Sequence, residues 1–311
     1  MKHGIVVIGG SAGSIGPLRE LVRQLPPNFP AAVMVVIHLQ ADKVSRLAEI
    51  LNTTGSLPAV QVSAPQTIMP GTCYVAVPDY HMVIEDSRVS PWRGPREDRQ
   101  RPSVNALFRS AAAAYGPQVI GVILSGMLSD GSAGLWWIKQ YGGVAVVQNP
   151  DTAEFSSMPS SVLEYVDVDH VVDAADLAPL LLKLADDVAR PAVENAQMES
   201  KEPVDFRCPD CGGPLSKIKY GRALEYRCLV GHAFTPAGML KAHSEAEENV
   251  LWSSVAVLEE SVKLIGQLAS HLPPDEAKRL ESHLEKRVAL AAKARELVEN
   301  LDHLHIPEAE E

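Results

Sequence analysis

Short apolar runs alternate with amphipathic segments over residues 1–190. The runs contain almost no polar residues, so both faces of the corresponding strands are expected to be buried. This pattern predicts an α/β fold with a doubly wound, mostly parallel sheet. The spacing around Pro78-Asp79 further predicts a local antiparallel hairpin between two of the strands, 72–77 and 82–85. Strands are predicted at 5–8, 32–37, 72–77, 82–85, 119–124, 144–147 and 169–172, and helices at 15–24, 45–52, 103–115, 131–141 and 175–188.

The hydrophobic pattern changes after Arg190. A polar, acidic stretch typical of a linker is followed by a segment with paired Cys and His residues, and then by two helical arms separated by Pro273-Pro274. Near-heptad apolar spacing predicts that the arms form an antiparallel hairpin, whose apolar stripe either covers the opposite arm or serves for dimerisation or partner docking. The predicted parts are residues 1–190 (α/β domain), 191–204 (linker), 205–235 (Cys/His module), 236–303 (helical hairpin) and 304–311 (acidic tail).

Composition restricts the compartment and the partners. A net charge of −11 argues against nucleic-acid binding, and the chain has no apolar run long enough to span a membrane. The strand predicted at residues 5–8 leaves no room for a signal peptide, and four cysteines in 311 residues do not make a disulfide scaffold. We therefore expect a cytoplasmic protein without membrane insertion. The loop that contains Arg96, Arg99 and Arg101 is either a solvated loop or a docking surface for an acidic partner.

Three polar residues follow predicted buried strands. Ser11 lies in the turn Gly-Gly-Ser-Ala-Gly after strand 5–8. This turn either binds a phosphate or presents Ser11 as a nucleophile. His38 follows strand 32–37, and Asp130 follows strand 119–124 and precedes a helix that it is also expected to cap. Because parallel strands end at one edge of a sheet, these residues are expected to converge there as nucleophile, base and orienting carboxylate.

A nucleotide-binding oxidoreductase is the main alternative for the Ser11 turn. The glycines at positions 9, 10, 13 and 16 do not have the Gly-x-Gly-x-x-Gly spacing, and His38 stands where the acidic residue after the second strand is expected. The turn also differs from the Gly-x-Ser-x-Gly elbow of α/β-hydrolases. These differences disfavour both alternatives.

An ordered series of motifs over residues 1–188 closely resembles the catalytic domain of the chemotaxis protein-glutamate methylesterases (CheB type). Its segments are Gly9-Gly-Ser-Ala-Gly13, Val36-Ile-His-Leu39, Tyr74-Val-Ala-Val-Pro-Asp-Tyr-His81, Arg101-Pro-Ser-Val-Asn-Ala-Leu-Phe-Arg-Ser110, Leu124-Ser-Gly-Met-Leu-Ser-Asp-Gly131, Gln148-Asn-Pro and Met158-Pro.

The resemblance implies a serine hydrolase that demethylates glutamyl methyl esters on chemoreceptors or related signalling proteins, deamidates certain glutamines, and needs no cofactor for catalysis. It implies that Ser11 is the nucleophile, His38 the base and Asp130 the aspartate. The oxyanion contact falls on the backbone amide of Met127, with Ala12 as the neighbouring position where the family often has a threonine.

Chemotaxis members of the family usually carry a receiver domain ahead of the catalytic segment, whereas strand 5–8 here opens the sequence. We therefore expect activity that is constitutive, or controlled by a regulatory protein or by the C-terminal residues. Two further alternatives stay open: a non-catalytic signalling scaffold that retains the fold, and an esterase of a pathway other than chemotaxis.

The Cys/His module has the spacing of a metal site. Cys208-x₂-Cys211 and Cys228-x₃-His232 are separated by 16 residues and supply four ligands, which predicts a closed, structural zinc site. Two short strands on either side of Gly221 complete the outline of a zinc ribbon. We expect loss of zinc to unfold residues 205–235 and to leave Ser11 chemistry measurable.

Overall fold

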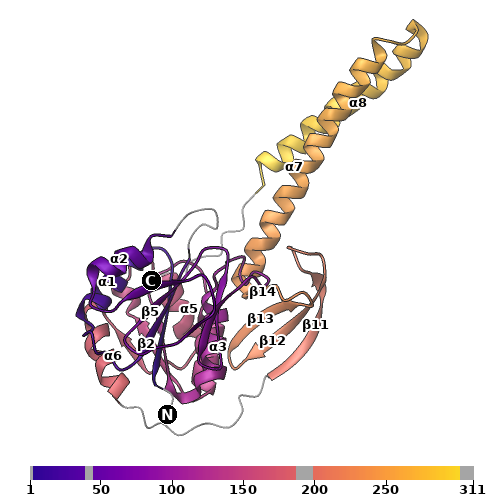
Figure 1. The fold of residues 1–311 in the computed structure, drawn as a ribbon. Coiled ribbons are helices and arrows are strands. Elements are labelled where there is room, and N and C mark those ends of the chain that lie inside the picture. The colour runs from indigo at the N-terminus through magenta and orange to yellow at the C-terminus, as the bar shows by residue number, and fades with distance from the viewer. Residues whose placement is uncertain (1–2, 39–44, 187–198, 302–311) are drawn as a thin grey trace. The chain divides into compact units, whose positions relative to one another are not determined.

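The computed structural model describes residues 3–38, 45–186 and 199–301, which form two compact units with a boundary between Met239 and Leu240. A seven-stranded parallel sheet forms the centre of the first unit (Figure 1). Its strand order is β10-β9-β8-β1-β2-β5-β3, and every neighbouring pair is parallel. The bounds are β1 Ile5–Gly10, β2 Ala32–Ile37, β3 Ala59–Val62, β5 Cys73–Ala76, β8 Val119–Ile123, β9 Val144–Gln148 and β10 His170–Val172.

The strand order reverses at β1, the central strand of the sheet. β2 pairs with one side of β1 and β8 with the other, so that Ile5 is in register with both Ala32 and Val119. In a doubly wound sheet, ligands bind outside the carboxyl ends of the strands where the strand order reverses. That position here is the carboxyl edge of β1, β2 and β8.

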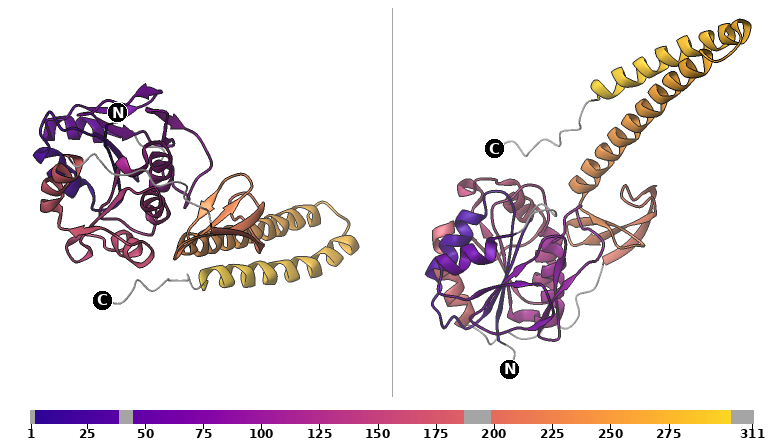
Figure 2. Two further views of the ribbon diagram at one scale, coloured as in Figure 1. Left: turned by 90° about the horizontal axis from the view of Figure 1, so that it is seen from below. Right: turned by 45° about the horizontal axis from the view of Figure 1, so that its top comes forward.

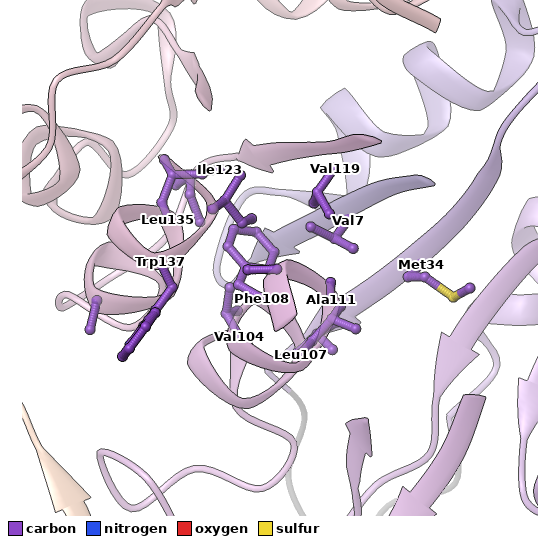
Figure 3. Packing of buried hydrophobic residues seen from close by; sticks show 14 of the residues in the cluster. Val7, Met34, Val104, Leu107, Phe108, Ala111, Val119, Ile123, Leu135 and Trp137 are labelled. Atoms are coloured by element: carbon purple, nitrogen blue, oxygen red, sulfur yellow. The ribbon is translucent and has the colours of Figure 1, made fainter. Parts of the chain in front are cut away.

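Helices cover both faces of the sheet, which explains the unbroken apolar strands. Ile5 and Val7 of β1 belong to one buried cluster, and Val6 and Ile8 belong to the other. Figure 3 shows Phe108 of α3 among Val7, Val119 and Ile123 of the first cluster. The helices of this face are α3 Val104–Tyr115, α4 Ser132–Gln140 and α5 Ser157–Tyr165, and those of the opposite face are α1 Ile15–Gln24, α2 Leu47–Thr54 and α6 Leu177–Asp186.

The predicted hairpin between strands 72–77 and 82–85 is wrong. β5 lies in the parallel sheet, whereas β6 (His81–Glu85) pairs with β7 (Arg88–Trp92). The turn between β6 and β7 is Asp86-Ser87, in which both residues have positive φ, as type I′ hairpin turns require. β7 also pairs with β4 (Gln66–Thr67) to complete a small three-stranded sheet. Within the described ranges, short 3₁₀ helices lie at Gly116–Gln118, Pro150–Thr152 and Ala174–Asp176.

A four-stranded antiparallel sheet follows in the first unit, with the order β11-β12-β13-β14. Its side chains Ile218, Tyr220 and Ala223 join the buried cluster of α3 and α4. Residues 199–204, predicted as part of the linker, lie in β11 because they pair with β12; residues 191–198 are outside the described residues. The strands are β11 Glu199–Arg207, β12 Pro214–Tyr220, β13 Ala223–Cys228 and β14 Ala233–Phe234.

Two long helices supply the described part of the second unit. α7 (Pro236–Ala269) crosses the boundary between the units, and α8 (Pro274–Glu299) returns alongside it (Figure 2). Arg295 of α8 forms an ion pair with Glu259 of α7 and lies 5.6 Å from the centre of the Trp252 ring. Neither these helices nor any other in the described ranges is long and apolar enough to cross a bilayer. The predicted acidic tail, 304–311, lies outside the described residues.

Candidate functional site

Ser11 lies at the carboxyl edge of β1, where the glycine turn ends the strand. Its backbone N–H donates to the carbonyl of Ser125, 3.0 Å away, which joins the ends of β1 and β8. Its carbonyl accepts from the hydroxyl and the backbone N–H of Ser14, just before α1 begins. Ser11 and His38 line one cleft of about 560 Å³, together with Gln148. The cleft therefore occupies the edge that the strand order predicts for ligands.

His38 and Asp130 are hydrogen-bonded at this edge. Nε2 of His38 lies 2.7 Å from Oδ2 of Asp130, and the two side chains are 10% and 2% exposed. The backbone N–H groups of Val104 and Asn105 and the hydroxyl of Ser103 also donate to the Asp130 carboxylate. Burial opposes ionisation of Asp130, but the hydrogen bond and charge of His38 and the two backbone N–H groups hold its pKa below the usual range. Asp130 is therefore a charged acceptor for the imidazole.

The expectation that Asp130 caps its own helix is wrong. α4 begins after Gly131, which has a φ of 105° and provides no side-chain cap. Asp130 instead binds the first turn of α3, while the Asn105 side chain of α3 accepts from the N–H groups of Gly131, just before α4, and of Gly134 within it. The start of α3 is thus held by a residue that precedes α4, and the start of α4 by a residue of α3. Sequence reasoning did not find Ser103 and Asn105, although both lie in a motif quoted above.

The geometry distinguishes the two nitrogens of His38. Because Nε2 binds Asp130, Nδ1 is the nitrogen left to take a proton from the cleft side. Among the described residues, the Ser11 hydroxyl forms no hydrogen bond with His38, although both line the cleft. Catalytic hydrogen bonds are often long without substrate and tighten when it binds.

The turn after β8 packs tightly against Ser11. A Cβ atom on Gly126 would lie 3.0 Å from Cβ of Ser11 and 2.5 Å from the Met158 sulfur, so this approach requires glycine. The Gly126 backbone is fixed on both sides, since its N–H donates to Phe155 and its carbonyl accepts from Met158. Of the predicted oxyanion positions, Ala12 lines the cleft. Met127 follows Gly126 in the turn and has a half-exposed side chain.

The arginine loop is organised around Asp79. Arg101, with its side chain 14% exposed, donates through two nitrogens to Asp79 Oδ1, and Arg93 donates to Oδ2. The hydrogen bonds from the Arg101 guanidinium hold the pKa of Asp79 below its usual range, and Arg93 adds to this effect. Arg96 lies 3.7 Å from the same carboxylate, and Arg99 lies 3.9 Å from Asp210. The predicted docking residues thus hold the loop together, and Arg96 and Arg99 keep side chains that are 46% and 37% exposed.

The four predicted metal ligands gather at the end of the antiparallel sheet. The ligand atoms of Cys208, Cys211, Cys228 and His232 lie within 4.8 Å of one another. The Cys211 and Cys228 sulfurs are 3.7 Å apart, and His232 Nδ1 lies 3.5 Å from the Cys228 sulfur and 3.8 Å from that of Cys208. Tetrahedral zinc with bonds of about 2.3 Å to sulfur separates its sulfur ligands by about 3.8 Å. The donor set and its spacing fit such an ion.

Comparisons with known proteins agree with this fold. A “Putative protein-glutamate methylesterase/protein-glutamine glutaminase” of Leptospira interrogans is 37% identical over 185 residues, which are 59% of this chain and 96% of that protein. A protein-glutamate methylesterase/protein-glutamine glutaminase of Thermotoga maritima is 32% identical over 184 residues, and this chain spans 54% of its length. The crystal structure of the Thermotoga maritima CheB methylesterase catalytic domain matches with a TM-score of 0.57 and 31% identity, over 59% of this chain and all of that domain.

A family model locates the likeness in the α/β part of the chain. The model for CheB methylesterase matches residues 6–181, which contain the seven parallel strands apart from the first residue of β1. Ser11, His38 and Asp130 all lie within it. The chain belongs to the CheB methylesterase family.

Proposed function

We propose that this protein is a serine hydrolase that demethylates glutamyl methyl esters on chemoreceptor-like signalling proteins and deamidates glutamines at such sites. The observation that carries the proposal is the part-buried His38–Asp130 hydrogen bond, together with the cleft that His38 and Ser11 both line. It is supported by the family to which the chain belongs and by the names of its relatives.

The mechanism uses groups of this chain alone. As Ser11 Oγ attacks the ester carbonyl, His38 takes the hydroxyl proton at Nδ1 and then gives it to the departing methoxide, which leaves as methanol. Asp130 holds the imidazole through Nε2 and stabilises the imidazolium. The backbone N–H groups of Ala12 and Met127 are the predicted oxyanion donors, and such a donor is worth about 3–4 kcal/mol of transition-state stabilisation.

Water then hydrolyses the glutamyl-enzyme with His38 again as base. The cleft is also lined by Glu20 and Glu154. The ester is neutral, whereas the product is a carboxylate that forms near these acidic side chains. Repulsion between like charges favours its departure. For a glutamine substrate, ammonia leaves in place of methanol.

Release of methanol from a methylated chemoreceptor signalling domain tests the proposal. The full chain is expected to release methanol until the methyl groups are consumed, and to release ammonia from the same domain with glutamine at the methylation sites. A scaffold that retains only the fold releases neither. Release of neither product by folded protein would refute the proposed activity, and hydrolysis of methyl esters only on other proteins would place the enzyme in a different pathway.

We further propose that Cys208, Cys211, Cys228 and His232 hold a structural Zn²⁺ ion. Four protein ligands leave no position open for substrate, as in closed structural sites. Burial raises the pKa of the Cys73 thiol, the remaining cysteine, to about 12, and Cys73 lies within the parallel sheet as a small apolar residue.

Elemental analysis of the full chain is expected to find one Zn²⁺ per chain after dialysis, and Cys228→Ser is expected to lose it because a hydroxyl is a poor zinc ligand. Cys73→Ala is the matched control, since it removes a thiol that is not near the cluster and should retain the metal. Equal zinc contents in the Cys228→Ser variant and the native chain would contradict the site.

The remaining interactions are predictions. Docking of an acidic partner on Arg96 and Arg99 is supported by their partial exposure. Self-association or binding of a regulatory protein through the C-terminal helices is supported by exposed apolar side chains on them, among which are Val250, Val257, Leu264, Leu268, Val288 and Leu297.

A further inference from the structure

Thr235 connects the antiparallel sheet of β11, β12, β13 and β14, called the Cys/His sheet below, to the loop that carries Asp130. It lies between β14 and α7 and is buried. Its backbone N–H and its hydroxyl both donate to Asp98 Oδ1, at 2.7 and 3.0 Å. The same hydroxyl accepts from the Ser129 hydroxyl at 2.8 Å and from the Gly238 N–H at 3.1 Å. One side chain thus joins the start of α7, the arginine loop and the residue next to Asp130.

The loop around Ser129 needs such support. Leu128 adopts a φ of 67°, a left-handed conformation that is costly for a residue with a branched side chain and persists only where the surroundings enforce it. Gly131 follows with a φ of 105°. Asp130 between them is held on the far side by α3 and His38. The hydrogen bond from Ser129 to Thr235 holds the loop on the side of the Cys/His sheet.

A second connection reaches Asp130 through α3. Arg109 of α3 forms an ion pair with Glu97, whose carboxylate also lies 4.0 Å from Arg227 of β13. Arg227 in turn pairs with Glu225 on the same strand, and both glutamates are almost fully buried. Buried charges that lose their partners are strongly destabilising. The position of α3, whose first turn binds Asp130, is therefore coupled to the position of β13.

The Cys/His sheet packs on the core of α3 and α4 through Ile218, Tyr220 and Ala223 at its β12–β13 turn, whereas Cys228 and β14 lie at its other end. Small modules of this size usually need a metal to fold. Thr235 is only three residues beyond His232. The Cys228 N–H donates to the His232 carbonyl, which closes the loop of residues 228–232, called the metal loop here. Asp98 is packed so closely that a Cβ atom on Gly238 would lie 2.1 Å from its carboxylate. An unfolded metal loop would release Thr235 from both Asp98 and Ser129.

We propose that Thr235 is a positioning residue for Asp130 and that Zn²⁺ in the Cys₃His site controls the activity of the cleft through it. The inference rests on the proposed esterase function and extends it. The metal takes no part in the reaction. It keeps the sheet folded, the sheet holds Ser129 through Thr235, and the loop then presents Asp130 to His38.

Substitution of Thr235 in the full chain tests the first step. Thr235→Val keeps the shape of the side chain and removes the hydroxyl, and Thr235→Ser restores the hydroxyl. We expect Thr235→Val to lower kcat for methanol release by about 10- to 100-fold with little change in KM, because misplacement of a catalytic group costs rates of that order. Thr235→Ser should have nearly native kcat. Urea unfolding midpoints establish that both variants are folded under the assay conditions.

Removal of the metal tests the second step. A strong chelator applied to the full chain should lower kcat by a similar factor and shift the tryptophan emission, because Trp136 and Trp137 lie 5.3 and 5.7 Å from the Tyr220 ring of β12. Zn²⁺ added alone should restore both signals, and Cys228→Ser should reproduce the metal-free state.

The outcomes separate the two proposals. Native kcat in Thr235→Val would overturn the positioning role of Thr235, and native kcat in chain shown by elemental analysis to lack zinc would overturn the control by zinc. Either result would leave the esterase function intact. A folded, zinc-loaded chain that releases no methanol would overturn both. A fall in kcat for Thr235→Val that Thr235→Ser shares would also contradict the inference, because the hydroxyl would then not be the responsible group.

Discussion

Ser11→Ala is expected to lower the rate of methanol release by roughly 10⁴- to 10⁶-fold, because it removes the proposed nucleophile and leaves only binding and oxyanion stabilisation. The fold should tolerate the change. The contacts that fix Ser11 are made by its backbone, with the Ser125 carbonyl and with the N–H and hydroxyl of Ser14. The free energy of unfolding should therefore change by less than about 0.5 kcal/mol.

Covalent labelling gives the prediction a readout that does not need the receptor. A fluorophosphonate, which reacts with activated serines, should attach to Ser11 in the native chain and fail to react with Ser11→Ala. Ser63→Ala is the matched control, since Ser63 is exposed and lies outside the cleft. If Ser11→Ala releases methanol as fast as the Ser63→Ala control, Ser11 is not the nucleophile.

The parallel sheet was predictable because its strands are apolar throughout. β1, β2 and β8 are buried at every position, so burial on both faces leaves a continuous signal in the sequence. β3 was not predicted, since Gln61 interrupts a strand of only four residues. β7 lies between β4 and β6, but Pro91 falls beyond the two residues that pair with β4, and this proline and the exposed Trp92 left no strand pattern in the sequence. α5 was also missed, because Pro159 lies inside a helix of nine residues.

The positions of the site residues could be predicted from the ends of the strands, but their hydrogen-bond partners could not. Ser11 and His38 each follow a buried strand, and parallel topology brings such ends together. Asp130 binds the start of α3, and Asn105 of α3 binds the start of α4. The two helices start 28 residues apart, at Val104 and Ser132, so no local sequence pattern encodes these contacts.

Thr235 illustrates the same limit in the C-terminal part. Thr-Pro-Ala-Gly at 235–238 is a typical helix start, with Thr at the cap and Pro in the first turn. That signal predicts the beginning of α7. It does not predict that the capping hydroxyl also contacts Asp98, 137 positions earlier, and Ser129. Burial, and after it the negative charge of Asp130, raise the pKa of Asp98 well above its usual range.

Asp130→Asn is expected to lower kcat by about 10⁴-fold, because the amide no longer stabilises the imidazolium and favours the wrong tautomer of His38. The variant also has a packing conflict. Oδ1 accepts from the Asn105 N–H and Oδ2 accepts from the Val104 N–H, so either orientation of the amide points an NH₂ group at a backbone donor. We expect the free energy of unfolding to fall by about 3 kcal/mol at neutral pH, since charge-assisted hydrogen bonds are lost.

The pH dependence of that loss identifies its cause. The folded-state pKa of Asp130 is lowered, so its contribution to stability is complete above the unfolded-state value of about 3.9 and is lost as the pH falls through the folded-state value. The difference in unfolding free energy between native chain and Asp130→Asn should thus be constant from neutral pH down to about pH 5 and shrink below about pH 4. Asp169→Asn is the matched control, because Asp169 accepts from Lys139 and from the Ala145 N–H at the opposite edge of the sheet. It should retain native kcat. A kcat for Asp130→Asn within tenfold of this control would mean that His38 works without its carboxylate, and the proposed triad would be wrong.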